Sequence, residues 1–94
     1  MIHEVSGGGL ALVVQSDLVG GLTNRVVVPV ASARDIPNVD RRLVPVVAVG
    51  DDTLHAVVPL ITVLPESAIR SPIQDASDHA GDVVRAIDML LSGV

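Results

Sequence analysis

The sequence predicts a mainly β fold of the α+β class, in which a compact antiparallel sheet is closed by one C-terminal α-helix. Nineteen of the 94 residues are valine, whose β-branched side chain is stiff in a helix and fits the pleated surface of a strand. Short apolar runs separated by glycine and proline fill the first three quarters of the chain, and the apolar spacing becomes helical only near the end. A length of 94 residues fits one domain spanning residues 1–94.

The first three strands are expected at residues 2–5, 10–15 and 25–31. Three consecutive glycines at residues 7–9 supply a flexible turn between the first two strands. Pro29 lies inside the third run and has no backbone N–H to donate. The third strand is therefore predicted to lie at a sheet edge or to carry a bulge.

A hairpin is expected next, formed by strands at residues 43–49 and 53–58. The Gly-Asp-Asp sequence at residues 50–52 separates the two apolar runs, and this composition favours a tight turn. Pro45 places the same constraint, an edge position or a bulge, on the first strand of the hairpin.

Two further short segments are expected at residues 60–64 and 68–73. Both are bracketed by prolines, which cannot donate to a ladder. Neither segment is therefore predicted to be a central, fully hydrogen-bonded strand. The prolines are Pro59, Pro65 and Pro72.

From Ser77 onward the apolar residues recur at helical spacing and predict one amphipathic helix. Asp75 or Ser77 can cap its first turn, and Gly93 ends it. The apolar stripe either completes the core of the domain or docks into a groove on a partner protein, and periodicity alone leaves both interpretations open. The stripe consists of Ala80, Val83, Val84, Ile87, Leu90 and Leu91.

The composition favours a folded chain that gains stability from association. Hydrophobic residues make up 49% of the chain and charged residues 18%, unlike a disordered segment. There are no cysteines, which excludes disulfides, zinc–thiolate sites and cysteine nucleophiles. Because small domains without such cross-links often bury additional area against a partner chain, we expect an oligomer.

The charge balance disfavours a nucleic-acid-binding protein. Six arginines, no lysine and eleven acidic residues give a net charge of -5 and a pI near 4.8, whereas phosphate binding requires a basic surface. The chain has no Phe, Trp or Tyr on which bases could stack. Arg41 and Arg42, which follow Asp40, are interpreted as a solvated charge cluster rather than an anion site. We therefore expect no direct binding of nucleic acid by the chain alone.

Neither a membrane span nor a secretory signal is expected. The longest apolar runs, at residues 26–33 and 43–50, are interrupted well before the roughly 18 to 20 residues that a span needs. Residues 1–4 begin no basic region or apolar stretch of the signal-peptide type. The expectation is a soluble, cytoplasmic protein.

The polar residues form no recognisable catalytic, metal or cofactor motif. His3, His55 and His79 are scattered, without acidic residues at metal-ligand spacing. Adjacent Asp51 and Asp52 would point to opposite faces of a strand. The triple glycine is not followed by the helix and lysine of a phosphate-binding loop. We therefore expect structural roles for these residues and no metal or cofactor.

Four separated blocks of sequence follow one another in an informative order. The first three are strand-like: VQSDL at residues 14–18, RVVVPVASA at residues 25–33 and LVPVVAVGD at residues 43–51. The fourth, AIDMLLSGV at residues 86–94, is helical and ends in a polar residue, a glycine and an apolar residue. In this order the blocks resemble the successive strand motifs and the terminal helix of the CcdB toxin family.

The resemblance to CcdB implies a toxin of a type II toxin–antitoxin module, with an SH3-like antiparallel β-barrel of the CcdB/MazF type and one C-terminal α-helix. Such toxins are homodimers and are not enzymes. They bind the A subunit of DNA gyrase and trap its complex with cleaved DNA. A cognate CcdA-like antitoxin neutralises the toxin, and the pair usually represses its own operon.

The resemblance also implies which residues contact gyrase. In the family the end of the terminal helix and the last three residues make the contact, and apolar residues after the Gln-Ser-Asp motif lie nearby. Carried over to this sequence, the gyrase-binding residues are Asp88, Leu91, Ser92, Gly93 and Val94, supported by Leu18 and Val19.

Two alternative functions remain open. Ser92 stands where the best-known gyrase-poisoning member has a tryptophan, so one alternative is a remnant that dimerises, binds its antitoxin and regulates its operon without poisoning gyrase. The MazF and PemK endoribonucleases share the fold, and RNA cleavage would need a base, an acid and phosphate-binding arginines in one groove. The residues available for that chemistry are Asp17, Arg25, Arg34 and His55.

Overall fold

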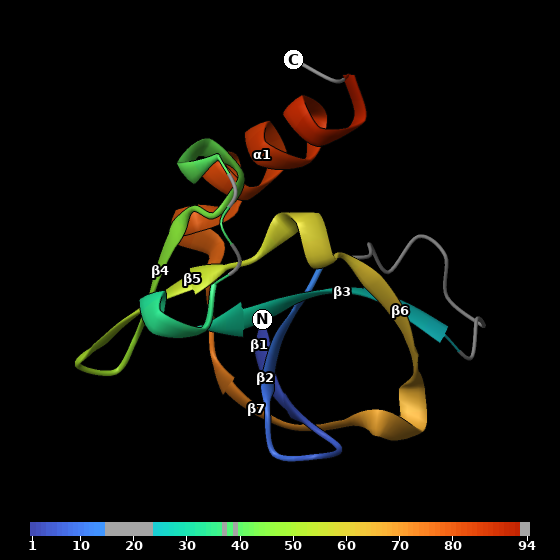
Figure 1. Cartoon of the computed structure of the whole chain (residues 1–94). Coiled ribbons are helices and arrows are strands. Elements are labelled where there is room, and N and C mark those ends of the chain that lie inside the picture. The colour runs from blue at the N-terminus through green and yellow to red at the C-terminus, as the bar shows by residue number, and fades with distance from the viewer. Residues whose placement is uncertain (15–23, 37, 39, 93–94) are drawn as a thin grey trace.

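A computed structural model of the chain describes residues 1–14, 24–36, 38 and 40–92 (Figure 1). The described strands form one sheet of seven, in the order β4-β5-β3-β2-β1-β7, with β6 pairing with β3. One α-helix, α1 (Ala80–Ser92), follows the sheet, which confirms the mainly β, α+β class. The strands are β1 (Ile2–Val5), β2 (Leu10–Val13), β3 (Asn24–Ala31), β4 (Val46–Val49), β5 (Asp52–Ala56), β6 (Thr62–Pro65) and β7 (Ile69–Gln74).

The central strand of the sheet is β3, and its pairs with β2, β5 and β6 show no register shift, so the prediction that Pro29 places it at an edge or in a bulge is wrong. On one side β3 pairs with β2. On the other side its residues 24–27 pair with β6 and its residues 30–31 with β5. Pro29 lies between these two partners, and its carbonyl accepts a hydrogen bond from Val57 N at 2.8 Å. In an antiparallel strand, the N–H and the C=O of one residue point to the same side. The N–H that Pro29 lacks would therefore point toward Val57, where β3 changes its partner from β6 to β5, and no ladder hydrogen bond is lost.

The predicted hairpin is confirmed as β4 and β5, but its strands are shorter than predicted, because Leu43 and Val58 each lie in a 3-10 helix. Val49 pairs with Asp52, and the loop between them begins with Gly50, whose φ of 61° lies in the left-handed region that glycine adopts without strain. The two proline-bracketed segments are peripheral, as predicted. Among the described strands, β6 pairs with β3 alone and β7 with β1 alone.

The strands curve into an incomplete ring (Figure 1), and the described pairing does not close them into the expected SH3-like barrel. Strands β4 and β7 are the two ends of the order. The Gln74 side chain spans them instead, because its Nε2 donates to Ala48 O at 2.7 Å and its Oε1 accepts from Gly50 N at 2.8 Å. Ala48 N donates to His79 Nε2 at 3.4 Å. Side chains therefore bond to the backbone groups of Ala48 and Gly50 at the β4 edge. In a closed barrel, a neighbouring strand would bond to this edge instead.

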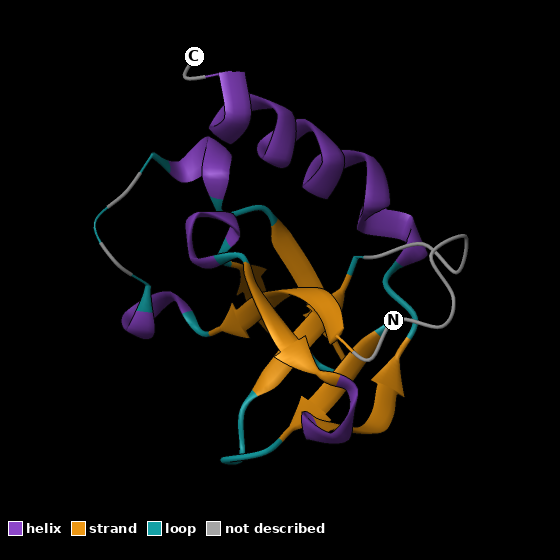
Figure 2. Cartoon of the chain, turned by 90° about the vertical axis from the view of Figure 1, so that its right-hand side faces the viewer, coloured by secondary structure: helices purple, strands orange, loops and turns teal. Residues whose placement is uncertain are grey.

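Helix α1 confirms the helix predicted from the apolar spacing. It continues a 3-10 helix, η6 (Ser77–His79), whose N-cap is Ala76 and not the predicted Asp75 or Ser77. Asp75 still lies beside the first turn, because its Oδ1 accepts from Ser77 N at 2.9 Å. Gly93, predicted to end the helix, lies outside the described residues. Figures 1 and 2 show α1 lying across one end of the sheet. There it contacts two 3-10 helices, η3 (Arg41–Leu43) and η4 (Val58–Leu60).

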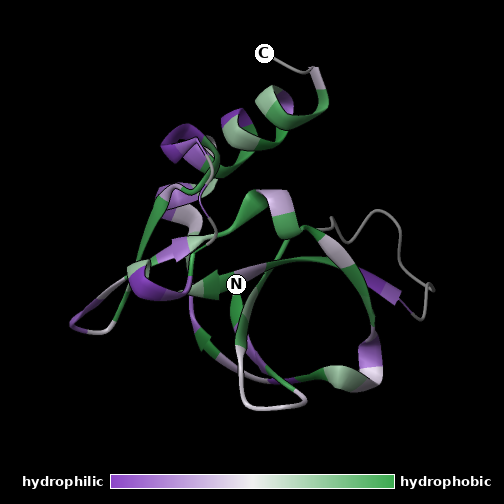
Figure 3. Ribbon diagram, in the orientation of Figure 1, coloured by the Kyte–Doolittle hydropathy of each residue, from purple (hydrophilic) through white to green (hydrophobic). Residues whose placement is uncertain are grey.

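The core lies between the sheet and α1. Figure 3 shows that hydrophobic residues dominate the strands, whereas hydrophobic and hydrophilic residues alternate around α1. Within the described part of the chain, no helix combines the length and the hydropathy that a membrane span requires. The buried cluster is formed by Ile2, Leu12, Val28, Val30, Val47, Ala56, Val58 and Ala76, together with Val83 and Ala86 of α1.

Candidate protein interaction site

The apolar residues of α1 divide between two faces, because each residue of an α-helix advances by about 100°. Val83 is 3% exposed, and Ile87 and Leu90 pack against the buried cluster. Val84 and Leu91 are seven residues apart and share another face, where they are 55% and 79% exposed. Some residues of the stripe therefore complete the core, as one interpretation predicts. Others are exposed, and their docking on a partner stays a prediction.

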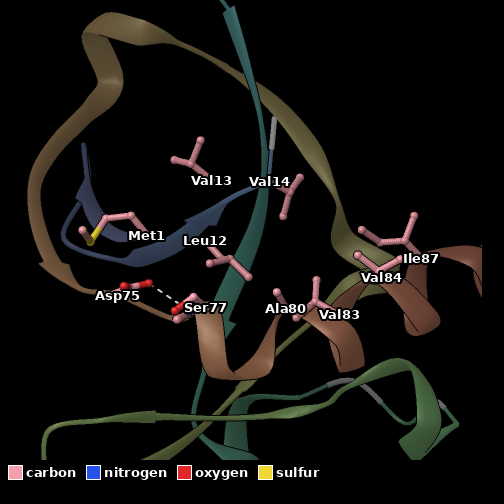
Figure 4. A pocket seen from close by; sticks show the side chains of 11 residues that line it. Met1, Leu12, Val13, Val14, Asp75, Ser77, Ala80, Val83, Val84 and Ile87 are labelled. Carbon is pink, nitrogen blue, oxygen red and sulfur yellow. Dashed lines mark hydrogen bonds between the residues drawn. The ribbon is translucent and has the colours of Figure 1, made fainter. Parts of the chain in front are cut away.

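An apolar groove of about 300 Å³ runs beside the exposed face of α1 (Figure 4). Met1 and Val14 line it from the sheet side, and Val84 and Ile87 line it from the helix. Ile87 and Leu91 are neighbours on the helix surface at i, i+4 spacing. We call the surface formed by Met1, Val14, Val84, Ile87 and Leu91 the apolar flank. The groove is completed by Leu12, Val13, Asp75, Ala76, Ser77, Ala80 and Val83.

Three of the residues predicted to contact gyrase lie together at the end of α1. Asp88, Leu91 and Ser92 are all exposed, and Leu91 is the most exposed large hydrophobic residue of the described chain. Ser92 Oγ donates to Met89 O at 3.4 Å, a bond within the helix. The carboxylate of Asp88 has no hydrogen bond or ion pair with any described residue. The other four predicted residues, Leu18, Val19, Gly93 and Val94, lie outside the described residues.

Two of the residues considered for RNA cleavage, His55 and Arg25, lie far apart. His55 pairs with Ala31, whereas Arg25 lies six residues earlier in β3, about 20 Å away along an extended strand. The guanidinium of Arg25 also pairs with Glu66, with 3.4 Å between Nη2 and Oε1. The imidazole and this arginine are therefore too far apart to act on one phosphate. Arg34 lies in the 3-10 helix η2 (Ala33–Asp35), and Asp17 lies outside the described residues.

The three histidines contact backbone groups. Nδ1 of His3 lies 2.9 Å from Arg70 O, and Nδ1 of His55 lies 3.0 Å from Val44 O. His79 accepts from the β4 edge, as described above. The structure therefore shows the structural roles that we expected for them. Among the described residues, no group of three or more His, Cys, Asp or Glu side chains could hold a metal ion.

The clearest electrostatic perturbation is in η3. Arg42 Nη2 lies 2.6 Å from Asp40 Oδ2, and Arg42 N donates to Asp40 Oδ1 at 2.9 Å. The side-chain hydrogen bond from Arg42, followed by the backbone bond, lowers the pKa of Asp40 to about 2, and the same side-chain bond raises the pKa of Arg42. Asp40 thus stays ionised as the cap of η3.

Sequence reasoning missed Met1, Val14 and Val84 as surface residues. A signal was present in α1, because Val83–Val84 and Leu90–Leu91 are adjacent apolar pairs. Each pair widens the apolar arc by about 100° beyond a narrow core stripe. An arc of that width can extend past the edge of a small core. The contribution of Met1 and Val14 depends on how the sheet is placed beside the helix, which no local pattern encodes.

Comparison with protein families bears directly on this surface. The profile described as CcdB protein matches residues 4–93. The chain belongs to the CcdB family. The match extends from β1 through the whole of α1, so it includes the exposed helix end. Membership of the CcdB family assigns this chain to the toxins of toxin–antitoxin systems.

Proposed function

We propose that this CcdB-family protein binds the A subunit of DNA gyrase through the end of α1 and traps the complex of gyrase with cleaved DNA. The observation that carries the proposal is the exposure of Leu91, at 79%, beside the polar side chains of Asp88 and Ser92. Leu91 continues into the rest of the apolar flank, and contiguous apolar surface is typical of a protein-binding site. The family match supports the same target class.

No catalytic residue is required for this action. A poison needs only to bind the cleaved state of gyrase more tightly than the resting state, because differential affinity shifts the equilibrium between them. The chain has no aromatic residue, so aliphatic side chains must anchor the contact. Complete burial of a side chain such as Leu91 would contribute about 1.5–3 kcal/mol.

The protein acts as a cytoplasmic homodimer in this proposal. Two copies related by a two-fold axis would present two α1 ends to the two-fold symmetric gyrase. Dimerisation fits a 94-residue chain that has no disulfide to stabilise its small core. The remaining partner is a cognate CcdA-like antitoxin, which neutralises the toxin and joins it in repressing their operon.

The decisive experiment measures linear DNA trapped by gyrase from the same organism, with supercoiled plasmid and ATP, in the presence of the purified protein. Wild type is expected to accumulate the cleavage complex. Leu91→Ser is expected to raise the concentration needed by about tenfold or more, because it removes the main aliphatic anchor. Val63→Ser is the matched control, since Val63 is 56% exposed on β6, away from α1.

The same assay distinguishes a gyrase poison from a toxin remnant that binds its antitoxin without poisoning gyrase. If wild type traps no DNA and leaves supercoiling unchanged while it still binds antitoxin, gyrase poisoning is wrong for this chain. The presence of Ser92 in place of a tryptophan would then explain the loss. In that case Ser92→Trp is expected to restore trapping.

A further inference from the structure

A second groove lies on the opposite side of α1 from the apolar flank. It is bounded by α1, by η3 and by the start of β4, and its volume is about 490 Å³. The helix residues that line it share one face, nearly opposite Val84 and Leu91 at about 100° per residue. We call it the arginine groove. Its lining residues are Arg41, Arg42, Pro45, Val46, Asp82, Arg85, Ala86 and Met89.

The floor of the arginine groove is apolar. Val46 is 46% exposed although it is a β-branched strand residue, and Met89 is partly buried beside it. Methionine adapts its shape to different neighbours more readily than other apolar side chains do. The floor can therefore accept an aliphatic side chain from another molecule.

The rim of the arginine groove carries three of the six arginines of the chain. Arg42 and Arg85 pair with Asp40 and Asp82, their close neighbours in sequence. These pairs are solvent-exposed, and ion pairs of that kind are weak enough to exchange for another carboxylate. The guanidinium of Arg41 has no hydrogen bond or ion pair with any described residue. Three arginines against two carboxylates make this a locally positive surface on a chain of net charge -5.

The edge of β4 opens into the same groove. Ala48 and Gly50 direct their backbone groups away from β5, to the side chains of His79 and Gln74. Alternation along the strand directs the N–H and C=O of Val46 to the same edge. Neither group bonds to a residue of the described chain. The β4 edge is therefore covered by side chains at Ala48 and Gly50 and open at Val46, which lines the arginine groove.

We propose that the arginine groove binds an extended acidic segment of a partner protein. An aliphatic side chain of the segment packs on Val46 and Met89, and its carboxylates pair with Arg41 and Arg85. Its backbone forms one pair of hydrogen bonds with Val46, as a short strand added to the β4 edge. Leu91, the main anchor of the proposed gyrase contact, faces away from this groove, whereas Ser92, seven residues after Arg85, lies on the groove side of α1.

The apolar floor, the open strand edge and the arginines of the groove together favour a protein segment over a nucleic acid as the ligand. An apolar floor and an open strand edge match an extended peptide, which has alternating side chains and backbone hydrogen-bonding groups. A nucleic acid would meet the strongly acidic remainder of the chain. Charge complementarity with three arginines selects acidic residues beside the aliphatic anchor.

The test is an NMR titration of the ¹⁵N-labelled full chain with two short synthetic peptides. One alternates Asp and Glu with Leu and Val, and in the other Lys replaces every acid. The acidic peptide is expected to shift the amide signals of Arg41, Val46 and Arg85, with binding that weakens as salt is raised.

Arg41→Glu should weaken binding about five- to tenfold, whereas Arg34→Glu, the same charge change at an exposed site in η2, should have little effect. Val46→Thr should weaken binding about threefold and Val63→Thr should not.

Several results would overturn the proposal. These are equal binding of the lysine peptide, equal weakening by Arg34→Glu, shifts confined to other surfaces, or no shifts at millimolar peptide. Shifts of the groove signals on dilution without peptide would show that a second copy occupies it, which also contradicts the proposal. Because Arg41→Glu leaves Leu91 unchanged, it is expected to trap gyrase as wild type does. Failure of one proposal is therefore distinguishable from failure of the other.

Discussion

The two flanks of α1 differ in chemistry although one helix supplies both. The apolar flank exposes Val84 and Leu91 and offers a partner apolar side chains. The arginine groove surrounds its apolar floor with charged side chains such as Arg41 and Arg85. Association at the first flank is therefore expected to be nearly insensitive to salt, and association at the second to weaken with it. A 13-residue helix can present two such surfaces because its core face takes up only part of its circumference.

The largest expected effect is a difference in the free energy of unfolding between a substitution on the core face of α1 and one on the apolar flank. Val83→Ala should lower the free energy of unfolding by about 2 kcal/mol, because it removes two methyl groups from a fully packed site. Val84→Ala should change it by less than about 0.5 kcal/mol, since the side chain is half-exposed and alanine favours the helix. Urea denaturation of both variants provides the comparison. Equal losses would contradict the assignment of Val83 to the core face and Val84 to the exposed face of α1.

A smaller effect is expected at the strand edge that borders the arginine groove. Gln74→Ala removes both bonds to Ala48 and Gly50 and should cost about 1–2 kcal/mol of stability. The amide of Gly50 should also exchange its hydrogen faster. Ser71→Ala, at an exposed position of the same strand, serves as the control. Unchanged exchange at Gly50 would contradict the role of Gln74 in covering the edge.

The smallest expected effect is on the pH dependence of stability, through the ion pair of Asp40 and Arg42 at the arginine groove. Since Arg42 lowers the pKa of Asp40 to about 2, below its unfolded value of about 3.9, the ionised carboxylate stabilises the folded state. That contribution is complete above pH 4 and is lost as pH falls through about 2. Arg42→Gln should return the midpoint toward the ordinary carboxyl value in an NMR titration of Asp40. A midpoint that stays near 2 in this variant would show that Arg42 is not the cause.

Local patterns in the sequence were sufficient for several elements and for part of the candidate site. The hairpin follows from apolar runs on either side of Gly50, and the helix from 3.6-residue spacing after Ser77. Both depend on residues close in sequence, which is why they could be predicted. The resemblance of four sequence blocks likewise identified the family. The role that it implies for the helix end with Asp88, Leu91 and Ser92 stays a prediction.

The sequence by itself determined that the chain forms β-strands followed by one amphipathic helix, and it determined the acidic charge of the whole. Only the tertiary structure decided that Pro29 lies where β3 changes partner, that Gln74 spans the sheet ends, and that Val84 is exposed while Ala86 is buried. The physical reason is that these outcomes depend on which distant segment lies beside each residue. An apolar arc wider than the core it covers must leave one side exposed, and the packing of α1 on η3 and η4 decides which side that is.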